Sequence, residues 1–296
     1  MTKFATMKTR NIELIIAFAA MMCCGITKAQ TAGSGDGGWK LVWSDEFDRD
    51  GRPDSAVWNY EHGFVRNHEA QWYQAENAFQ EGGKLIIEAR REHLPNPTYR
   101  EGGRHWGQQR THIDYTSACM TTRDKFDFCY GRMEVCAWIP TAGGSWPAIW
   151  TLGYGMEWPS CGEIDIMEFY RIKGIPHILA NAAWGDDERY HPVWNSKRIP
   201  FTHFTQRDPE WAQRFHLWRM DWDKTSIRIY LDDELLNEVP LESTVNGSRG
   251  HHLNPFERRQ YILLNLALGG DNGGIIDDGA FPMRYEIDYV RVYQRK

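Results

Sequence analysis

Short segments of alternating apolar and polar residues recur along the chain, and no other sequence feature constrains the fold as strongly. A period of two is typical of half-buried β-strands, and Gly, Pro, Asn or Asp bounds each segment. Long amphipathic helical patterns are missing, and only residues 208–215 are compatible with one short helix. Many short strands separated by turns predict an all-β sandwich or barrel. The clearest strand patterns are residues 84–89, 131–139, 226–231 and 287–293.

The organisation of the chain is simple. Its 296 residues are 42% hydrophobic and 25% charged, which is the balance of an ordinary folded protein. Residues 30–38 form a glycine-rich lead-in, and after them the sequence contains no Pro/Ser-rich linker, repeat or low-complexity segment. We therefore expect one domain over residues 39–296.

The first 29 residues have the pattern of a signal peptide. Basic residues precede an apolar run over residues 14–26, and small residues follow it up to Ala29. A run of about 13 residues is too short to cross a bilayer as a helix. We expect cleavage after Ala29 and export to the periplasm, the cell surface or the medium. The alternative is a lipoprotein anchored through Cys23 or Cys24.

The charge of the chain excludes two classes of partner. It has 34 Lys and Arg against 40 Asp and Glu, so its formal net charge is −6. Removal of residues 1–29, which contain four basic residues and one acid, would leave 30 basic against 39 acidic residues and a net charge of −9. A protein without a basic surface is not expected to bind nucleic acid or an anionic membrane. We therefore expect neither a nucleic-acid partner nor a membrane span. We also expect the protein to be a monomer.

Four cysteines remain after residue 29, namely Cys119, Cys129, Cys136 and Cys161. An exported protein can form disulfides, and four cysteines allow three complete pairings between which the sequence does not choose. One bridge and four free thiols are both compatible with the sequence. No Cys/His spacing resembles a zinc site.

Residues 162–170 combine a strand pattern with a concentration of acids. Glu163, Asp165 and Glu168 alternate with the apolar Ile164 and Ile166. A charged row on the solvent face of a strand is the ordinary interpretation of such a pattern. Solvent faces usually mix both signs of charge, however, whereas three neighbouring acids repel one another and raise at least one pKa. Such an arrangement costs stability and is typical of a site of proton transfer.

The spacing of the two glutamates predicts a β-bulge. Strict alternation would place Glu163 and Glu168 on opposite faces of the strand. One extra residue around Ile166 and Met167 would bring both onto one face, on either side of Asp165. Carboxyls about 5–5.5 Å apart fit a retaining glycosidase, in which one is the nucleophile and the other is acid and then base. Asp165 would hydrogen-bond the nucleophile and keep the neighbouring acid protonated by repulsion.

Tryptophan is as common as the other large aromatic residues, with 14 Trp beside 13 Tyr and 13 Phe. Trp146 and Trp150 are four apart and therefore share one face of a strand, with the small Ala148 between them. An ordinary core pair is the alternative, but the nearby acids favour a platform on which a sugar ring stacks. In residues 261–268 the apolar set points to the core, which leaves Asn265 on the other face.

These segments resemble glycoside hydrolase family 16. Residues 163–168 match its bulged E-x-D-x-x-E signature, and residues 146–150 match its tryptophan-rich strand. The likeness extends over nearly the whole chain after the signal segment. It includes residues 43–47, 67–73, 215–218 and 287–293.

The resemblance implies a β-jelly-roll sandwich of two curved antiparallel sheets with an open cleft on the concave face. It further implies an endo-acting, retaining hydrolase of β-linked polysaccharides that requires no cofactor. Glu163 would be the nucleophile, Asp165 its helper and Glu168 the acid/base. The substrate-binding residues implied by the same resemblance are Asn67, Trp146, Trp150, His216 and Asn265. Some family members hold a structural calcium, and the matching positions here are Asp288 and carbonyls near Glu46.

The chain departs from glucan-cleaving members of that family after the acidic strand. Those members tend to show a His-Tyr or His-Trp pair where this chain has Ala183 and Trp184. Residues 186–213 are expected to form an enlarged loop over one end of the cleft, with basic residues that could contact a sulfated or sialylated glycan. The candidate substrates therefore include glucan, galactan, sulfated algal galactan and mucin-type O-glycans.

Two other classes of function fit part of the sequence. A carbohydrate-binding jelly roll would need the tryptophans but not three acids on a bulged strand. A metal-dependent hydrolase would also use clustered carboxylates, but no histidine or further acid stands at useful spacing around Glu163, Asp165 and Glu168. Both are weaker than the glycosidase hypothesis.

Overall fold

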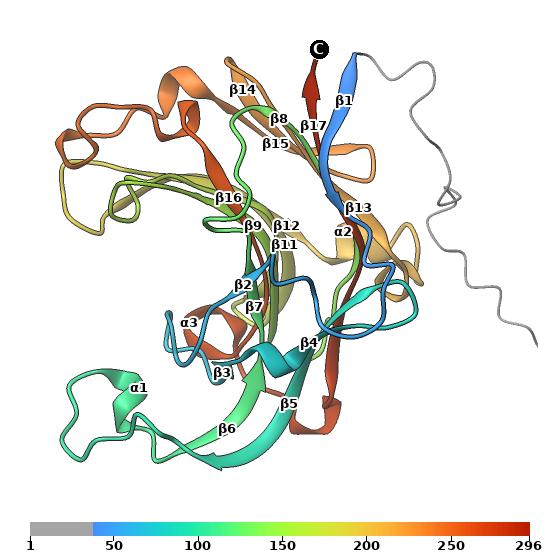
Figure 1. Ribbon diagram of the computed structural model, residues 1–296, viewed down its shortest axis with the longest axis vertical. Helices are drawn as coiled ribbons and strands as arrows, with labels where there is room; N and C mark the ends of the chain where they lie inside the picture. Colours follow the sequence, from blue (N-terminus) through green and yellow to red (C-terminus); the bar gives the residue numbers. More distant parts are fainter. Residues whose placement is uncertain (1–37) are drawn as a thin grey trace, which may run out of the picture.

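The computed structural model describes residues 38–296. The expected signal peptide and most of the lead-in lie outside these residues. Two β-sheets face each other, as the alternating segments predicted, and short helices lie in the connections (Figure 1). All strand pairings within the described chain are antiparallel except that of β3 with β6.

Sheet A is the larger layer. Its strands, in order across the sheet, are β15 (Glu234–Pro240), β14 (Ser226–Leu231), β13 (His216–Trp222), β8 (Gly131–Trp138), β17 (Met283–Arg295), β5 (Leu85–Pro95), β6 (His112–Ser117) and β3 (Gln71–Tyr73), with β1 (Trp39–Asp45) on β17 and β4 (Ala78–Gln80) on β5.

Sheet B is the smaller layer and contains both the acidic strand and the tryptophan-rich strand. Its strands, in order, are β12 (Pro192–Pro200), β11 (Ile175–Gly185), β10 (Glu163–Ile172), β9 (Ser145–Gly153), β16 (Gln260–Leu268), β7 (Cys119–Thr121) and β2 (Asn59–Tyr60).

The helices of the described chain are all short. The α-helices are α1 (Trp106–Gln109), α2 (Thr202–Thr205) and α3 (Gly270–Gly273), and the 3-10 helices are η1 (Ala75–Asn77), η2 (Trp211–Gln213), η3 (Leu241–Ser243), η4 (Ser248–Gly250), η5 (Pro255–Glu257) and η6 (Asp278–Ala280). Within residues 38–296, none of the helices is long and apolar enough to cross a membrane.

The main core lies between the two sheets, and strand alternation explains which side chains fill it. On β10 the isoleucines Ile164 and Ile166 are fully buried in this core, whereas the acids face the other side of sheet B. The apolar set of β16 joins the same core, as its pattern predicted: Ile262, Leu264, Leu266 and Leu268. This burial fixes the face of each strand, because a slip by one residue would expose its whole apolar set.

Two sequence-based expectations about residues 186–213 are wrong in part. The expected enlarged loop contains β12, a regular strand that pairs along its length with β11 at the edge of sheet B. The short helix expected over residues 208–215 is only the 3-10 turn η2. Polar and basic residues obscured the strand pattern of β12, because an edge strand is exposed on more sides than a central one.

The four cysteines of the described chain are free thiols. Cys119, Cys136 and Cys161 are buried, and Cys129 is half-buried. The sequence left open one disulfide or four free thiols, and the structure has the four free thiols, with no disulfide among residues 38–296.

Candidate active site

The predicted β-bulge is present in β10. Its pairing with β9 shifts register between Asp165 and Met167, and its pairing with β11 shifts between Asp165 and Glu168. As a result Glu163, Asp165 and Glu168 all line one cleft of about 520 Å³ on the outer face of sheet B. The bulge therefore brings the three acids together, as the spacing predicted.

Strand pairing arranges the side chains of this cleft in three rows across sheet B. Each acid of β10 lies in one row between a residue of β9 and one of β11, and each row ends on β12. The first row is Leu152, Glu163, Ala183 and Trp194; the second is Trp150, Asp165, Asn181 and Ser196; the third is Ala148, Glu168, Leu179 and Arg198.

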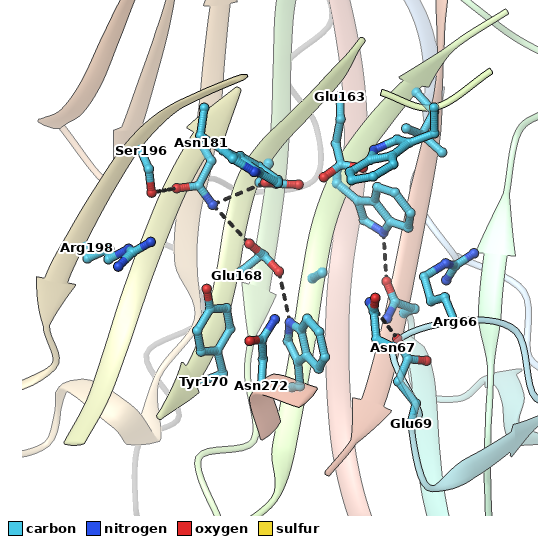
Figure 2. Close-up of a pocket in the computed structure, with 18 residues that line it drawn as sticks. Arg66, Asn67, Glu69, Glu163, Glu168, Tyr170, Asn181, Ser196, Arg198 and Asn272 are labelled. Atoms are coloured by element: carbon cyan, nitrogen blue, oxygen red, sulfur yellow. Dashed lines mark hydrogen bonds between the residues drawn. The ribbon is translucent and has the colours of Figure 1, made fainter. Parts of the chain in front are cut away.

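Hydrogen bonds from neighbouring strands hold Glu168 in place. Trp146 Nε1 donates to Glu168 Oε1 at 2.9 Å, and Asn181 Nδ2 donates to Glu168 Oε2 at 3.0 Å (Figure 2). The same Asn181 nitrogen donates to Asp165 Oδ2 at 3.1 Å. Ser196 Oγ in turn donates to Asn181 Oδ1 at 2.5 Å. This bond orients the amide so that its NH₂ group faces the two acids.

Glu163 has a different environment from Glu168. Trp158 Nε1 donates to Glu163 Oε2 at 3.0 Å from the turn that precedes β10. Arg66 also lines the cleft, forms an ion pair with Glu61, and places its guanidinium 5.2 Å from the centre of the Trp150 ring. The two glutamates are therefore fixed by different indole donors, and the charge of Arg66 acts on Glu163.

All three acids have raised pKa values, and burial is the largest cause for each of them. Burial, followed by the charge of Glu168, raises the pKa of Glu163 to about 7. Burial likewise raises the pKa of Glu168 to about 7, although the donors Trp146 and Asn181 oppose the shift. The pKa of the fully buried Asp165 is raised furthest above its usual range, by burial and then by both glutamates. Proton exchange near neutral pH is therefore available to this cluster.

Two other charges distinguish the glutamates. The positive charge of Arg66 acts to lower the pKa of Glu163, against the dominant effects of burial and Glu168. The negative charge of Glu69 adds to burial in raising the pKa of Glu168. When the pair holds a single proton, these charges favour its location on Glu168 and an ionised Glu163.

The structure places Asp165 differently from the sequence-based expectation. The carboxyl of Asp165 hydrogen-bonds Glu168 rather than the expected nucleophile Glu163. Asn181, which lies opposite Asp165 on β11, bridges these same two acids. Asp165 is thus paired with the expected acid/base, and the charge of Glu163 helps to raise the pKa of Asp165.

Trp146 and Trp150 share one face of β9 and line the cleft, as predicted. Both are nevertheless largely buried, with exposed fractions of 5% and 8%. Trp150 Nε1 donates to Asn265 Oδ1 at 2.7 Å, and Asn265 Nδ2 donates to the hydroxyl of Tyr73 at 3.0 Å. Asn265 therefore reaches the cleft as expected and also fixes the plane of the Trp150 indole.

The loop that carries Asn67 forms one end of the cleft. Asn67 lines it, as expected, and donates from Nδ2 to Glu69 Oε1 at 3.3 Å. The backbone of Asn67 is left-handed, with φ of 54°. The Arg110 guanidinium donates to the carbonyls of His68, Glu69 and Ala70 and so holds this loop in place.

His216 is a correction to the sequence-based site. It lies on β13 of sheet A and does not line the cleft. Its ring is buried, stacks on Trp211 with 3.9 Å between ring centres, and hydrogen-bonds Asp232 and the carbonyl of Trp211. Because alternate residues of β13 face the core, His216 is a packed core residue of the other sheet.

Within the described chain, the structure shows no cluster of side chains near Asp288 and Glu46 that could bind the expected calcium ion. Among residues 38–296, no group of three or more His, Cys, Asp or Glu side chains is arranged to bind a metal ion. Arg291 donates to both carboxylate oxygens of Glu46, at 2.9 and 2.7 Å, so that carboxylate already has a cationic partner. A calcium ion bound mainly by carbonyl oxygens stays a prediction.

Several cleft residues were not identified from the sequence. Trp158 and Asn181 lie in the turn and the strand that follow β9 and β10, and no local pattern marks them as partners of the acids. On β12, the expectation of a loop concealed the strand face that carries three further lining residues. Trp194 and Arg198 belong to the segment 186–213 that was expected over one end of the cleft, and the lining residues missed are Arg66, Glu69, Leu152, Trp158, Tyr170, Asn181, Ser196 and Asn272.

Comparison with known proteins agrees with this geometry. The model of the family "Glycosyl hydrolases family 16" matches residues 65–291. A β-glucanase of Rhodothermus marinus is 37% identical over 274 residues, which cover 86% of this chain and 85% of that protein. The crystallographic laminarinase from Rhodothermus marinus is 36% identical, with a TM-score of 0.69 over 87% of this chain and 98% of that one.

A second solved structure is more similar in three dimensions. It comes from work on endo-acting O-glycanases that prominent members of the human gut microbiota express to initiate mucin breakdown. It is 32% identical to this chain, with a TM-score of 0.78, and the match covers 90% of this chain and 94% of that one.

The raised pKa values predict that the acids destabilise the protein at alkaline pH. In the folded protein Glu163 keeps its proton up to about pH 7, whereas its ordinary pKa is 4.5. The stability that this proton confers is fully present below pH 4.5 and is lost as the pH rises through 7. We expect Glu163→Gln to melt about 2–4 °C higher than the wild type at pH 8, and to differ little at pH 4.5.

Thermal unfolding followed by circular dichroism at the two pH values measures this difference. The control is Glu242→Gln, at an exposed position outside the cleft, which should change neither melting temperature. A Glu163→Gln variant that is less stable than the wild type at pH 8 would contradict the assigned shift.

Proposed function

The chain belongs to glycosyl hydrolase family 16 and is thus an endo-acting β-glycanase, and from this we propose a retaining enzyme that cleaves internal β-1,3 or β-1,4 linkages of a glucan or galactan by double displacement. The observation that carries the proposal is the bulged strand β10, which brings Glu163 and Glu168 into one cleft with Asp165 between them. Two carboxyls with separate roles are the minimum that double displacement requires.

In the first displacement, Glu163 acts as the nucleophile. Its carboxylate forms a bond to the anomeric carbon while the bond from that carbon to the glycosidic oxygen breaks. Glu168 donates its proton to the departing oxygen, so the shortened chain leaves with a hydroxyl. The charge of Arg66 supports an ionised Glu163, and Glu69 supports a protonated Glu168.

In the second displacement, Glu168 acts as the base. Its carboxylate takes a proton from water, the water oxygen bonds to the anomeric carbon, and the ester bond to Glu163 breaks. Both carboxyls return to their initial states. Asp165, Asn181 and Trp146 are positioning residues in this scheme, because their hydrogen bonds fix the Glu168 carboxyl between the two steps.

A second candidate is an endo-β-galactosidase that acts on mucin-type O-glycans. Two observations favour it. The O-glycanase structure matches this chain with a TM-score of 0.78, against 0.69 for the laminarinase. Ala183 also stands where the sequence resemblance leads us to expect a histidine in glucan-cleaving relatives, and it is directly opposite Glu163 in the cleft.

We further propose that the enzyme is exported and works as a monomer. The support for export is the signal-like pattern of residues 1–29. Polymeric β-glycans are substrates outside the cell, so an exported location fits an endo-acting hydrolase.

Substitution of either glutamate tests the catalytic assignment. We expect Glu163→Gln and Glu168→Gln each to lower the hydrolysis rate at least about 100-fold, since each removes the nucleophile or the proton donor. Reducing-end release from the preferred substrate measures the rate. Glu242→Gln should keep full activity, and undiminished turnover in either cleft variant would overturn the assignment.

The stereochemistry of the first product tests the double displacement. We expect the β-anomer to appear before mutarotation, because two inversions at one carbon retain its configuration. Proton NMR of the anomeric signals in the first minutes of the reaction distinguishes the two anomers. An initial α-anomer would show a single displacement by water and would exclude Glu163 as nucleophile.

A substrate panel separates the two candidate functions. The panel contains laminarin, mixed-linkage glucan, agar, porphyran, carrageenan, galactan and mucin O-glycans, with products identified by mass spectrometry. Rapid release of glucan oligosaccharides supports the first candidate, and release of galactose-ended fragments from O-glycans supports the second. Cleavage of none of these substrates would contradict both.

A further inference from the structure

Strand β12 presents a distinct surface to the cleft. Trp194, Ser196 and Arg198 alternate along the strand and all line the cleft, whereas the intervening Asn195 and Lys197 belong to the other face. Asn195 confirms this alternation, because its Oδ1 accepts a hydrogen bond from Asn237 of β15 in the opposite sheet. The face of β12 that carries Trp194 and Arg198 thus continues the floor of the cleft beyond the acids.

Arg198 is a cation without a carboxylate partner. Figure 2 shows it at the edge of the cleft beside Ser196 and Tyr170. No acid of residues 38–296 lies within ion-pair distance of Arg198, and its side chain is exposed. The other arginine of the cleft, Arg66, is instead paired with Glu61. The positive charge of Arg198 is therefore available to a ligand.

Trp194 provides an apolar surface on the same face of β12, about 13 Å along the strand from Arg198. Its exposed fraction is 43%, against 5% for Trp146 and 8% for Trp150, so it offers far more indole surface than the predicted platform. Ala183, which lies between Trp194 and Glu163 in the same row, is fully buried. The exposed indole of Trp194 is therefore the apolar surface that this row offers to a ligand.

The distance from the acids makes this end of the cleft suitable for a negative charge. β12 is two strands away from β10, which corresponds to roughly 9–10 Å across the sheet. An anion in contact with Arg198 would therefore lie closer to the arginine than to any of the three acids.

We propose that Trp194 and Arg198 form an outer binding surface for an acidic glycan, in which the indole stacks on one sugar ring and the guanidinium binds the sulfate or carboxylate group of a neighbouring sugar. A planar guanidinium matches the paired oxygens of either group. The proposal rests on the proposed function, since it assumes that a glycan occupies this cleft. It defines the substrate as a β-glycan that carries anionic substituents.

The experiment measures binding separately from hydrolysis. The probes are oligosaccharides of laminarin and of galactan, each in neutral form, sulfated, or oxidised at C6 to the uronate. Isothermal titration calorimetry is done in the Glu163→Gln background, so that no probe is cleaved. We expect an anionic form of at least one backbone to bind about 10-fold more tightly than its neutral form at low salt, with the preference lost in 0.5 M NaCl. The sulfated and oxidised forms identify which anion the binding surface prefers.

Substitutions on the two faces of β12 assign the preference to one residue. Arg198→Met should reduce it to less than twofold and leave the affinity for neutral probes unchanged. Lys197→Met, which removes an equal charge from the opposite face of the same strand, should preserve the preference. Arg198→Lys should retain part of it, and the melting temperatures of all variants check that β12 still folds. Trp194→Ala should weaken the binding of neutral and anionic probes alike.

Several outcomes would overturn the proposed binding surface. Equal binding of neutral and anionic probes would do so, and so would a preference that survives Arg198→Met. The proposed function is tested independently by wild-type hydrolysis of the whole set of probes, neutral and anionic. If none of them is cleaved but the Arg198-dependent preference in binding is present, the proposed function fails and the binding surface stands. If probes are cleaved but no Arg198-dependent preference is found, the proposed function stands and the binding surface fails.

Discussion

Three carboxyl groups buried together on one strand set the conditions for the rest of the site. Burial raises the pKa values of all three, and the charge of Glu168 adds to this effect on Glu163 and Asp165. The surrounding donors limit this cost. Trp146, Trp158 and Asn181 each donate to a carboxylate oxygen, so the acids are desolvated without losing their hydrogen bonds. The cluster is consequently held in a defined geometry with protons that exchange near neutral pH.

The β-bulge is what makes this cluster possible. Without the extra residue, Glu168 would point into the core between the sheets, where Ile164 and Ile166 are packed. The bulge keeps the isoleucines in that core and still turns Glu168 to the cleft. The bulge thus lets one face of β10 pack in the core while the other face carries all three acids. Bulges are common beside active sites, where they redirect a side chain in this way.

The two glutamates carry similar pKa shifts, and their different roles depend on more distant charges. Arg66 and Glu69 come from the same loop at one end of the cleft, yet Arg66 acts on Glu163 and Glu69 acts on Glu168. Arg110 holds the backbone of this loop through three carbonyls. At the opposite end, β12 contributes an exposed indole and an unpaired arginine. In the proposed mechanism the acids carry out hydrolysis, the first of these ends influences the location of the proton, and the second is the proposed binding surface for an anionic substrate.

Several strands, the faces of β10 and β16, and the bulge that gathers the three acids could be predicted from the sequence, whereas β12 could not. These features depend on spacing within one strand, because alternation is a local property of the extended backbone. The register between strands was decided only in the tertiary structure. That register sets Asn181 opposite Asp165, Ala183 opposite Glu163 and Arg198 in the row of Glu168. It also removed His216 from the cleft, since the histidine lies on a strand of the other sheet. Strand pairing joins residues that are distant in the chain, so the register between strands cannot be predicted from the spacing of residues within one strand.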